Sequence, residues 1–168
     1  VGVDNLLEGL IENGVPALRL GQPVKVRAAL REATLDARMM MHPLYADLED
    51  ERKALDGLTR KAQGLKGKEK GLAFKDRGIL LKHVKGLERR ITEEIIERAP
   101  VICATCIGSG HDRLGSIKFP VIVLDEATQA TEPSSLVPIT KGAERLILVG
   151  DHAQLPPTVI SQEAEREG

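Results

Sequence analysis

Residues 119–129 read Phe-Pro-Val-Ile-Val-Leu-Asp-Glu-Ala-Thr-Gln, and this stretch decides the fold. Four consecutive apolar residues, 121–124, lead directly into the adjacent carboxylates of Asp125 and Glu126. A short apolar run without polar alternation predicts a strand that is buried on both faces, as in a parallel sheet. Open α/β sheets bind their ligands at the carboxyl ends of such strands. We therefore expect Asp125 to face a phosphate-bound metal ion and Glu126 to face a water molecule.

A second stretch repeats this pattern about one strand and one helix later. Residues 145–157 read Arg-Leu-Ile-Leu-Val-Gly-Asp-His-Ala-Gln-Leu-Pro-Pro, so another apolar run ends in Gly150 and Asp151 and is followed by Gln154. Core packing alone could explain one apolar strand that ends in polar residues. It explains less well two such strands that deliver polar groups to the same edge of one sheet. The pair predicts the acid-bearing (Walker B) half of a nucleoside triphosphatase site, with the two acids and Gln154 at a common opening.

Composition limits the other functions open to the chain. Its 168 residues are 42% apolar, enough for one modest core, and a net charge of −1 gives no overall basic field for nucleic acid. Aromatic residues make up only 2%, which leaves few platforms for stacking bases. No run reaches about 18 apolar residues and no signal peptide is visible, so we expect no membrane association. The two cysteines form no disulfide framework, which favours an intracellular compartment, cytoplasmic or nuclear.

Helix formers and charged residues dominate residues 24–98, and apolar side chains recur there at helical spacing. We predict two antiparallel helices. Residues 61–71, which contain three glycines and four lysines, are expected to form an exposed, non-helical tip between them. Two interpretations of this basic tip stay open: it is solvated without a partner, or it contacts a phosphate backbone.

Shorter elements flank this helical region. Helical spacing predicts a helix over residues 3–12 that stops at Asn13-Gly14, and residues 15–20 predict a short strand. A hydroxyl, an acid and a proline in residues 131–133 predict the start of a short helix. Ser161 is the predicted cap of another helix at the end of the chain.

Cys103 and Cys106 have the spacing of a zinc-binding or redox pair. Zinc would need two more ligands, and the four histidines are scattered along the chain. Cys103 lies in an apolar run, where a cysteine behaves as a small apolar residue, so we favour that interpretation. The hydroxyl of Thr105 followed by Gly108 and Gly110 instead predicts backbone N–H groups open to a phosphate.

Four segments resemble motifs of the superfamily-one helicases, in the branch of the nonsense-mediated-decay RNA helicase and the immunoglobulin-mu-binding helicase. Residues 125–133 resemble motif II and residues 148–157 resemble motif III. Residues 101–110 resemble motif Ic, and residues 3–6 resemble the end of the motif Ia region. Four motifs in the right order are far more specific than a lone Asp-Glu pair.

The resemblance implies an α/β fold: an incomplete, parallel-sheet P-loop NTPase (RecA-like) domain with an inserted antiparallel helical hairpin. Residues 1–35 and 99–168 would form the two parts of RecA-like domain 1A, and residues 36–98 the insertion, subdomain 1C. The phosphate-binding Gly-x-x-x-x-Gly-Lys-Ser/Thr loop does not occur in the sequence. In this family it lies upstream of Val3, and the second motor domain would lie beyond Gly168. We expect this segment alone to hydrolyse no ATP and to leave a sheet edge open.

The resemblance also implies roles for individual residues. Asp125 would hold Mg²⁺ through its water shell, Glu126 would polarise the water that attacks ATP, and Gln154 would sense the γ-phosphate. The other implied contacts are a nucleotide-binding set and a nucleic-acid-binding set: Gly150, Asp151 and Gln154 for the first, and Thr105, Gly108 and Ser109 for the second.

The implied activity of the full-length protein is that of an ATP-dependent helicase, which couples ATP hydrolysis to 5′-to-3′ movement on single-stranded RNA or DNA. Two alternatives stay open: a nuclease-fused translocase, and a non-catalytic nucleic-acid-binding or scaffold relative. Intact Asp125, Glu126 and Gln154 argue against the second alternative. These motifs do not distinguish RNA from DNA, because they do not show which residues contact the 2′-hydroxyl.

Overall fold

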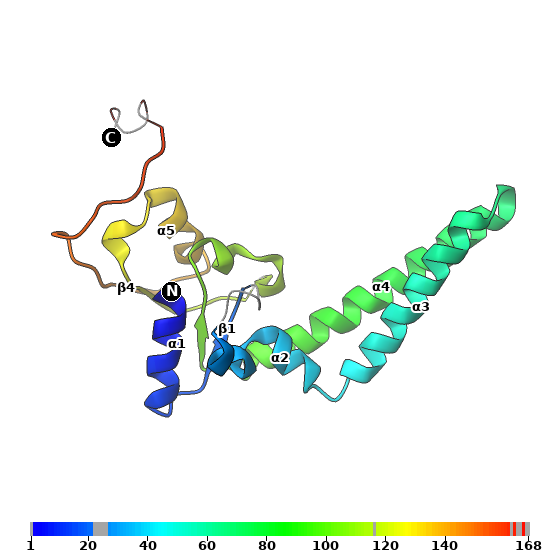
Figure 1. Cartoon of the computed structure of the whole chain (residues 1–168), viewed down its shortest axis with the longest axis horizontal. Helices are drawn as coiled ribbons and strands as arrows, with labels where there is room; N and C mark the ends of the chain where they lie inside the picture. Colours follow the sequence, from blue (N-terminus) through cyan, green and yellow to red (C-terminus); the bar gives the residue numbers. More distant parts are fainter. Residues whose placement is uncertain (1, 22–26, 116, 162, 164–165, 167–168) are drawn as a thin grey trace. The chain divides into compact units, whose positions relative to one another are not determined.

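The computed structural model describes residues 2–21, 27–115, 117–161, 163 and 166 (Figure 1). The chain divides into two compact units: Leu7–Ile102 forms one, and Val1–Leu6 with Cys103–Gly168 forms the other. The helix predicted after Ser161 falls largely outside the described residues. Among the helices that are described, none is long and apolar enough to cross a membrane.

Helix α1 (Gly2–Glu12) confirms the helix predicted over residues 3–12. It ends where the sequence predicts. The side-chain amide of Asn13 donates to the Gly9 carbonyl oxygen at 2.8 Å, and Gly14 has a φ of 72°. Glycine adopts this left-handed conformation without the steric cost of a Cβ atom, so Gly14 terminates the helix.

A two-stranded sheet pairs β1 (Ala17–Arg19) with β2 (Val101–Cys103). All three residues of β1 are buried, which confirms the strand predicted within residues 15–20. The 3₁₀ helix η2 (Ala28–Ala33) and helix α2 (Leu35–Met40) follow β1 along the chain and lead into the long helices.

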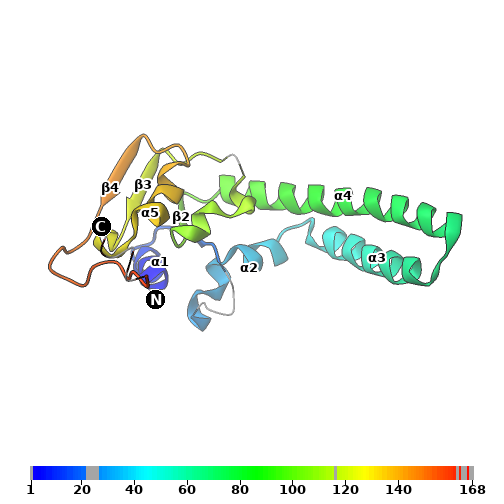
Figure 2. The ribbon, with the colours of Figure 1, turned by 90° about the horizontal axis from the view of Figure 1, so that it is seen from above.

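Helices α3 (Tyr45–Gly64) and α4 (Gly67–Glu97) form a hairpin, which confirms the two antiparallel helices predicted from the sequence (Figures 1 and 2). Only Leu65 and Lys66 connect them, so the prediction of a non-helical tip over residues 61–71 is wrong. Lysine, glutamine, glutamate and alanine favour helix. Two of the glycines lie at helix ends, where they cost little, and Gly67 uses a φ of 58° to start α4.

The hairpin combines a buried apolar stripe with polar links between its helices. Five apolar residues of the two helices are at most 5% exposed: Leu48, Ala62, Val84, Ile91 and Ile96. Arg77 Nε donates to Thr59 Oγ1 at 3.0 Å, and Arg52 Nη2 lies 3.4 Å from Glu88 Oε1. Burial of the stripe supplies most of the stability, because half-exposed ion pairs contribute little.

His42 and Arg90 meet at Glu94 near the base of the hairpin. His42 Nε2 lies 3.3 Å from Glu94 Oε2, and Arg90 Nε donates to Glu94 Oε1 at 3.0 Å. The hydrogen bond from Arg90, and then that from His42, hold the pKa of Glu94 below its usual range. A lowered pKa stabilises the fold above the unfolded value of about 4.3, and this contribution is lost as the pH falls through the folded value.

The other unit contains the parallel pair β3 (Val121–Leu124) and β4 (Arg145–Leu148), shown in Figure 2. Helix α5 (Glu132–Ile139) connects the two strands and packs on β3. Three 3₁₀ turns lie in the same unit: η3 (Ile107–Gly110), η4 (Asp112–Leu114) and η5 (Ala127–Gln129). Both predicted strands, their parallel pairing and the short connecting helix are confirmed, and with them the α/β class.

The prediction that both strands are buried on two faces is wrong. Ile122 and Leu124 are 8% and 5% exposed, whereas Val121 and Val123 are 50% and 57% exposed. Successive strand residues point to opposite faces, so one face of β3 is packed and the other is open. All four residues of β4 are exposed. An apolar run shows which residues tolerate burial, but it does not show how many layers pack on them.

Candidate active site

The acid pair and the Gly-Asp loop leave the β3–β4 sheet at the same edge. Leu124, the last residue of β3, is aligned with Leu148, the last residue of β4. The ladder continues one step beyond both strands, because the Val149 N–H donates to the Leu124 carbonyl oxygen at 2.9 Å. Asp125 and Gly150 therefore begin two loops that start side by side.

Glu126 turns the chain sharply away from β3. Its φ of 53° and ψ of 39° lie in the left-handed region, and it is the one non-glycine residue with positive φ in the described ranges. Such a conformation costs about 1–3 kcal/mol for a residue with a side chain. Gln129, at the end of η5, donates its N–H to the Glu126 carbonyl oxygen at 2.9 Å and its Nε2 to Glu126 Oε2 at 3.0 Å. The turn thus orients the exposed carboxylate.

Two hydrogen bonds join the loop after β3 to the loop after β4. The Ala127 N–H donates to the Val149 carbonyl oxygen at 2.8 Å, and the Thr128 hydroxyl donates to the Asp151 carbonyl oxygen at 3.2 Å. Gly150 lies between these contacts without room for a side chain. A Cβ atom there would lie 3.0 Å from the Thr128 nitrogen and 3.2 Å from the Ala127 nitrogen. A side chain at this position would therefore need the two loops to move apart by a few tenths of an ångström.

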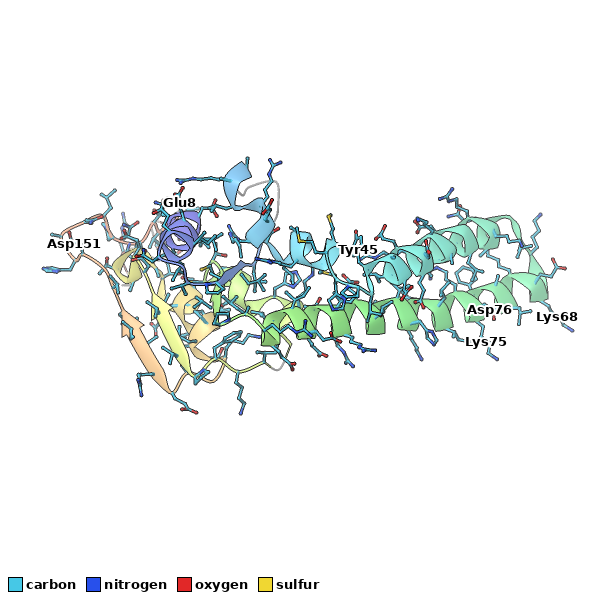
Figure 3. All side chains as sticks on the ribbon, turned by 90° about the horizontal axis from the view of Figure 1, so that it is seen from below. Glu8, Tyr45, Lys68, Lys75, Asp76 and Asp151 are labelled. Atoms are coloured by element: carbon cyan, nitrogen blue, oxygen red, sulfur yellow. The ribbon has the colours of Figure 1, made fainter. Side chains whose placement is uncertain are left out.

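Asp151 shapes the loop that carries Gln154. Its Oδ1 accepts the Ala153 N–H at 2.9 Å, and its Oδ2 accepts from Gln154 Nε2 at 3.2 Å. The Gln154 N–H also donates to the Asp151 carbonyl oxygen at 3.1 Å. Figure 3 labels Asp151 on this loop beyond β4. Because both of its carboxylate oxygens are used within the loop, Asp151 orients Gln154.

Asp125, Glu126 and Asp151 place three exposed carboxylates at this edge of the sheet. In the ranges that the structure describes, none of them pairs with a lysine or arginine. The same ranges contain no group of three or more His, Cys, Asp or Glu side chains that could hold a metal by itself. Mg²⁺ is commonly held by one or two carboxylates together with nucleotide phosphates and water. A single exposed carboxylate such as Asp125 fits that mode of binding.

The predicted nucleic-acid contacts lie in the turn after β2. The Thr105 hydroxyl oxygen accepts the Gly108 N–H at 3.0 Å, and the Ser109 N–H donates to the Thr105 carbonyl oxygen at 2.9 Å. The prediction of open N–H groups is therefore wrong for Gly108 and Ser109, because Thr105 closes the turn on itself. The turn packs closely on α5, where a Cβ atom at Gly110 would lie 2.8 Å from Val137 Cγ1.

The structure brings five of the predicted site residues into the two joined loops: Asp125, Glu126, Gly150, Asp151 and Gln154. The remaining three lie in the turn after β2 and form a separate group in the same unit: Thr105, Gly108 and Ser109. Sequence reasoning missed Thr128 and Gln129, whose side chains join and orient the loops. The spacing of Gln129 three residues after Glu126 was the available signal, since polar side chains at that spacing meet across a turn.

Comparison with known proteins agrees with this geometry. A family model described as an AAA domain matches residues 1–162. The regulator of nonsense transcripts 1 homolog of Neurospora crassa is 32% identical over 170 residues, which cover 100% of this chain and 14% of that protein. The ATP-dependent helicase NAM7 of Saccharomyces cerevisiae is 48% identical over 82 residues, covering 49% of this chain and 8% of that protein. The ATP-dependent helicase upf1 of Schizosaccharomyces pombe is 42% identical over 81 residues, covering 48% of this chain and 9% of that protein.

The parallel strand pair with its joined loops, together with the AAA-domain match, is that of a partial RecA-like domain of the nucleoside triphosphatase class. The comparisons narrow this class to one family. The chain belongs to the superfamily-one helicases, in the Upf1-like group. It spans 14% or less of the length of the three relatives described above.

Proposed function

We propose that the full-length protein is an ATP-dependent helicase, which couples ATP hydrolysis to 5′-to-3′ movement along a single strand of RNA or DNA. The observation that carries this proposal is the joining of the loops after β3 and β4, which places the acid pair and the Gln154 loop at one sheet edge. The names of the relatives support it, since two of the three are ATP-dependent helicases.

In this proposal Asp125, Glu126 and Gln154 act on ATP in different ways. Asp125 is the residue that would hold Mg²⁺, which when bound neutralises phosphate charge. Glu126, oriented by Gln129, positions the attacking water and accepts its proton. Gln154 contacts the γ-phosphate. Phosphoryl transfer depends mostly on positioning and charge neutralisation, which these groups supply. Residues outside this segment are proposed to supply the phosphate-binding loop.

ATP hydrolysis by the full-length protein tests the proposal. We expect turnover to rise several-fold when a single-stranded oligonucleotide is added, because a translocating motor couples the two activities. Phosphate release is measured with oligo(U), with oligo(dT) and without a strand, and the first two arms show whether RNA or DNA is preferred. Turnover that no single strand stimulates would contradict the helicase proposal.

The distal part of the hairpin is proposed to contact the phosphate backbone of the strand. Residues 60–87 contain nine lysines or arginines and only two acids. Lys66, Lys68 and Lys70 are all exposed, and Figure 3 labels Lys68 near the tip and Lys75 further along α4. A concentration of one charge sign at an exposed tip favours phosphate binding over a merely solvated face.

Replacing Lys66, Lys68 and Lys70 together by alanine tests this contact. We expect weaker binding of single strands and a shallower dependence of log Kd on log salt, by about 0.7 for each phosphate that the variant no longer neutralises. Lys53→Ala is the matched control, because Lys53 is an exposed lysine of α3 that lies 3.2 Å from Asp50. Fluorescence anisotropy over a series of salt concentrations gives both quantities. An unchanged salt slope in the triple variant would show that the tip is only solvated.

A further inference from the structure

We infer that Thr128 is a positioning residue for ATP hydrolysis: its hydroxyl sets the place of the Gln154 loop relative to Glu126. This inference rests on the proposed function and adds to it a residue whose side chain contacts neither the metal ion nor the nucleotide in that proposal. The contact that carries it is the hydrogen bond from Thr128 Oγ1 to the Asp151 carbonyl oxygen at 3.2 Å.

The acceptor of this bond is shared with the Gln154 loop. The Asp151 carbonyl oxygen accepts from the Thr128 hydroxyl and, at 3.1 Å, from the Gln154 N–H. The carboxylate of the same residue accepts from Gln154 Nε2 at 3.2 Å. Thr128 therefore donates to the one residue that holds both the backbone and the side chain of Gln154.

The other end of the connection is the turn η5. Gln129, the residue after Thr128, donates its Nε2 to Glu126 Oε2 at 3.0 Å, and in the described part of the chain Glu126 Oε1 accepts no hydrogen bond. The turn thus fixes one carboxylate oxygen and leaves the other for a water molecule. Two adjacent residues of the turn thus make different contacts: the Thr128 side chain reaches the Gln154 loop, and the Gln129 side chain reaches Glu126.

The reach of Thr128 distinguishes it from other hydroxyls of the same unit. Its acceptor lies 23 residues away in sequence. The hydroxyls of Ser134, Ser135 and Thr140 instead donate to carbonyl oxygens three residues earlier in their own turns. Local bonds of that kind stabilise one turn, whereas the Thr128 bond, together with the bond from the Ala127 N–H to the Val149 carbonyl oxygen, joins two separate segments. Its removal should therefore change the alignment of the site more than the fold.

Thr128→Val in the full-length protein removes the hydroxyl and keeps the branched shape. We expect kcat for strand-stimulated ATP hydrolysis to fall roughly fivefold, as for the loss of one neutral hydrogen bond. KM for ATP should change by less than about twofold, because the variant loses alignment rather than binding. Thr128→Ser should retain the wild-type rate. Thr140→Val is the matched control, since it removes an exposed hydroxyl-to-carbonyl bond of 3.0 Å outside the site, and it should leave the rate unchanged.

A double-mutant comparison shows whether Thr128 acts through Gln154. If it does, Thr128→Val causes no further loss of kcat in a Gln154→Ala background. If Thr128→Val lowered kcat by the same factor in the wild-type and Gln154→Ala backgrounds, the inference would be overturned. A wild-type kcat in the single Thr128→Val variant would also overturn it.

Hydrogen exchange tests the same contact without turnover. In Thr128→Val, and not in Thr140→Val, we expect faster exchange of the Ala153 and Gln154 amides. Unchanged exchange at both amides overturns the inference even when strand-stimulated turnover is present. Absence of that turnover in the wild type, with faster exchange in Thr128→Val, overturns the proposed function and leaves the positioning contact standing.

Discussion

Glu126→Gln in the full-length protein should reduce kcat for ATP hydrolysis by about 10²–10⁴-fold, the usual contribution of a positioned base. The amide keeps the size of the side chain, and its oxygen can still accept the Gln129 Nε2–H that now binds Glu126 Oε2 at 3.0 Å. The variant therefore keeps the turn and loses the proton acceptor. Its affinity for ATP should stay within about twofold of wild type, because the lost group acts on the attacking water. Single-turnover phosphate release and nucleotide titration measure the two quantities separately.

Glu144→Gln is the matched control for this prediction. Glu144 is an exposed carboxylate just before β4, at the opposite end of that strand from the two joined loops. We expect its removal to leave hydrolysis unchanged. A Glu126→Gln protein with wild-type turnover would show that another group activates the water.

Gly150→Ala is expected to damage both the site and the fold. The new Cβ would lie 3.0 Å from the Thr128 nitrogen, 3.1 Å from Thr128 Oγ1 and 3.2 Å from the Ala127 nitrogen. Two of these three atoms belong to the backbone and cannot rotate away, so the loops must separate. We expect a loss of about 1–3 kcal/mol in stability, as for other overpacked sites. Thermal melting and strand-stimulated hydrolysis, measured on the same preparations, should both fall.

Gly86→Ala gives the opposite expectation for the same chemical change. Gly86 lies inside α4, and a Cβ atom there has no neighbour within 4 Å. Alanine favours helix over glycine by up to about 1 kcal/mol, so this variant should melt at or above the wild-type temperature and keep its turnover. If both glycine variants melted alike, the close approach at Gly150 would not be a constraint.

Local patterns in the sequence were sufficient to predict the main elements of the fold. The apolar run before Asp125 predicted β3, the Asn13-Gly14 pair predicted the end of α1, and the proline-containing start over residues 131–133 predicted α5. Each of these signals depends on neighbouring residues and their backbone preferences. The five site residues after β3 and β4 could be predicted as a group, because parallel strands end at one edge.

The contacts that organise the site could not be predicted in the same way. The Thr128–Asp151 bond joins residues 23 positions apart, and the left-handed backbone of Glu126 is unusual for a glutamate. Glycine content misled the prediction for the hairpin tip, because the cost of a glycine depends on whether it lies inside a helix or at its end. Exposure of Val121 and Val123 depends on which layers pack on the sheet, and an apolar run does not contain that information.

The length of helix α4 has a consequence for the tip of the hairpin. At about 1.5 Å per residue, the 31 residues of α4 extend roughly 46 Å. The buried residues Ile91, Thr92 and Ile96 anchor one end of this helix, and Lys66 lies at the other. A tilt of roughly 5° at the anchored end would move the far end about 4 Å, the length of an atomic contact. A reorientation of that size at the base of the hairpin would therefore be enough to make or break contacts at its tip.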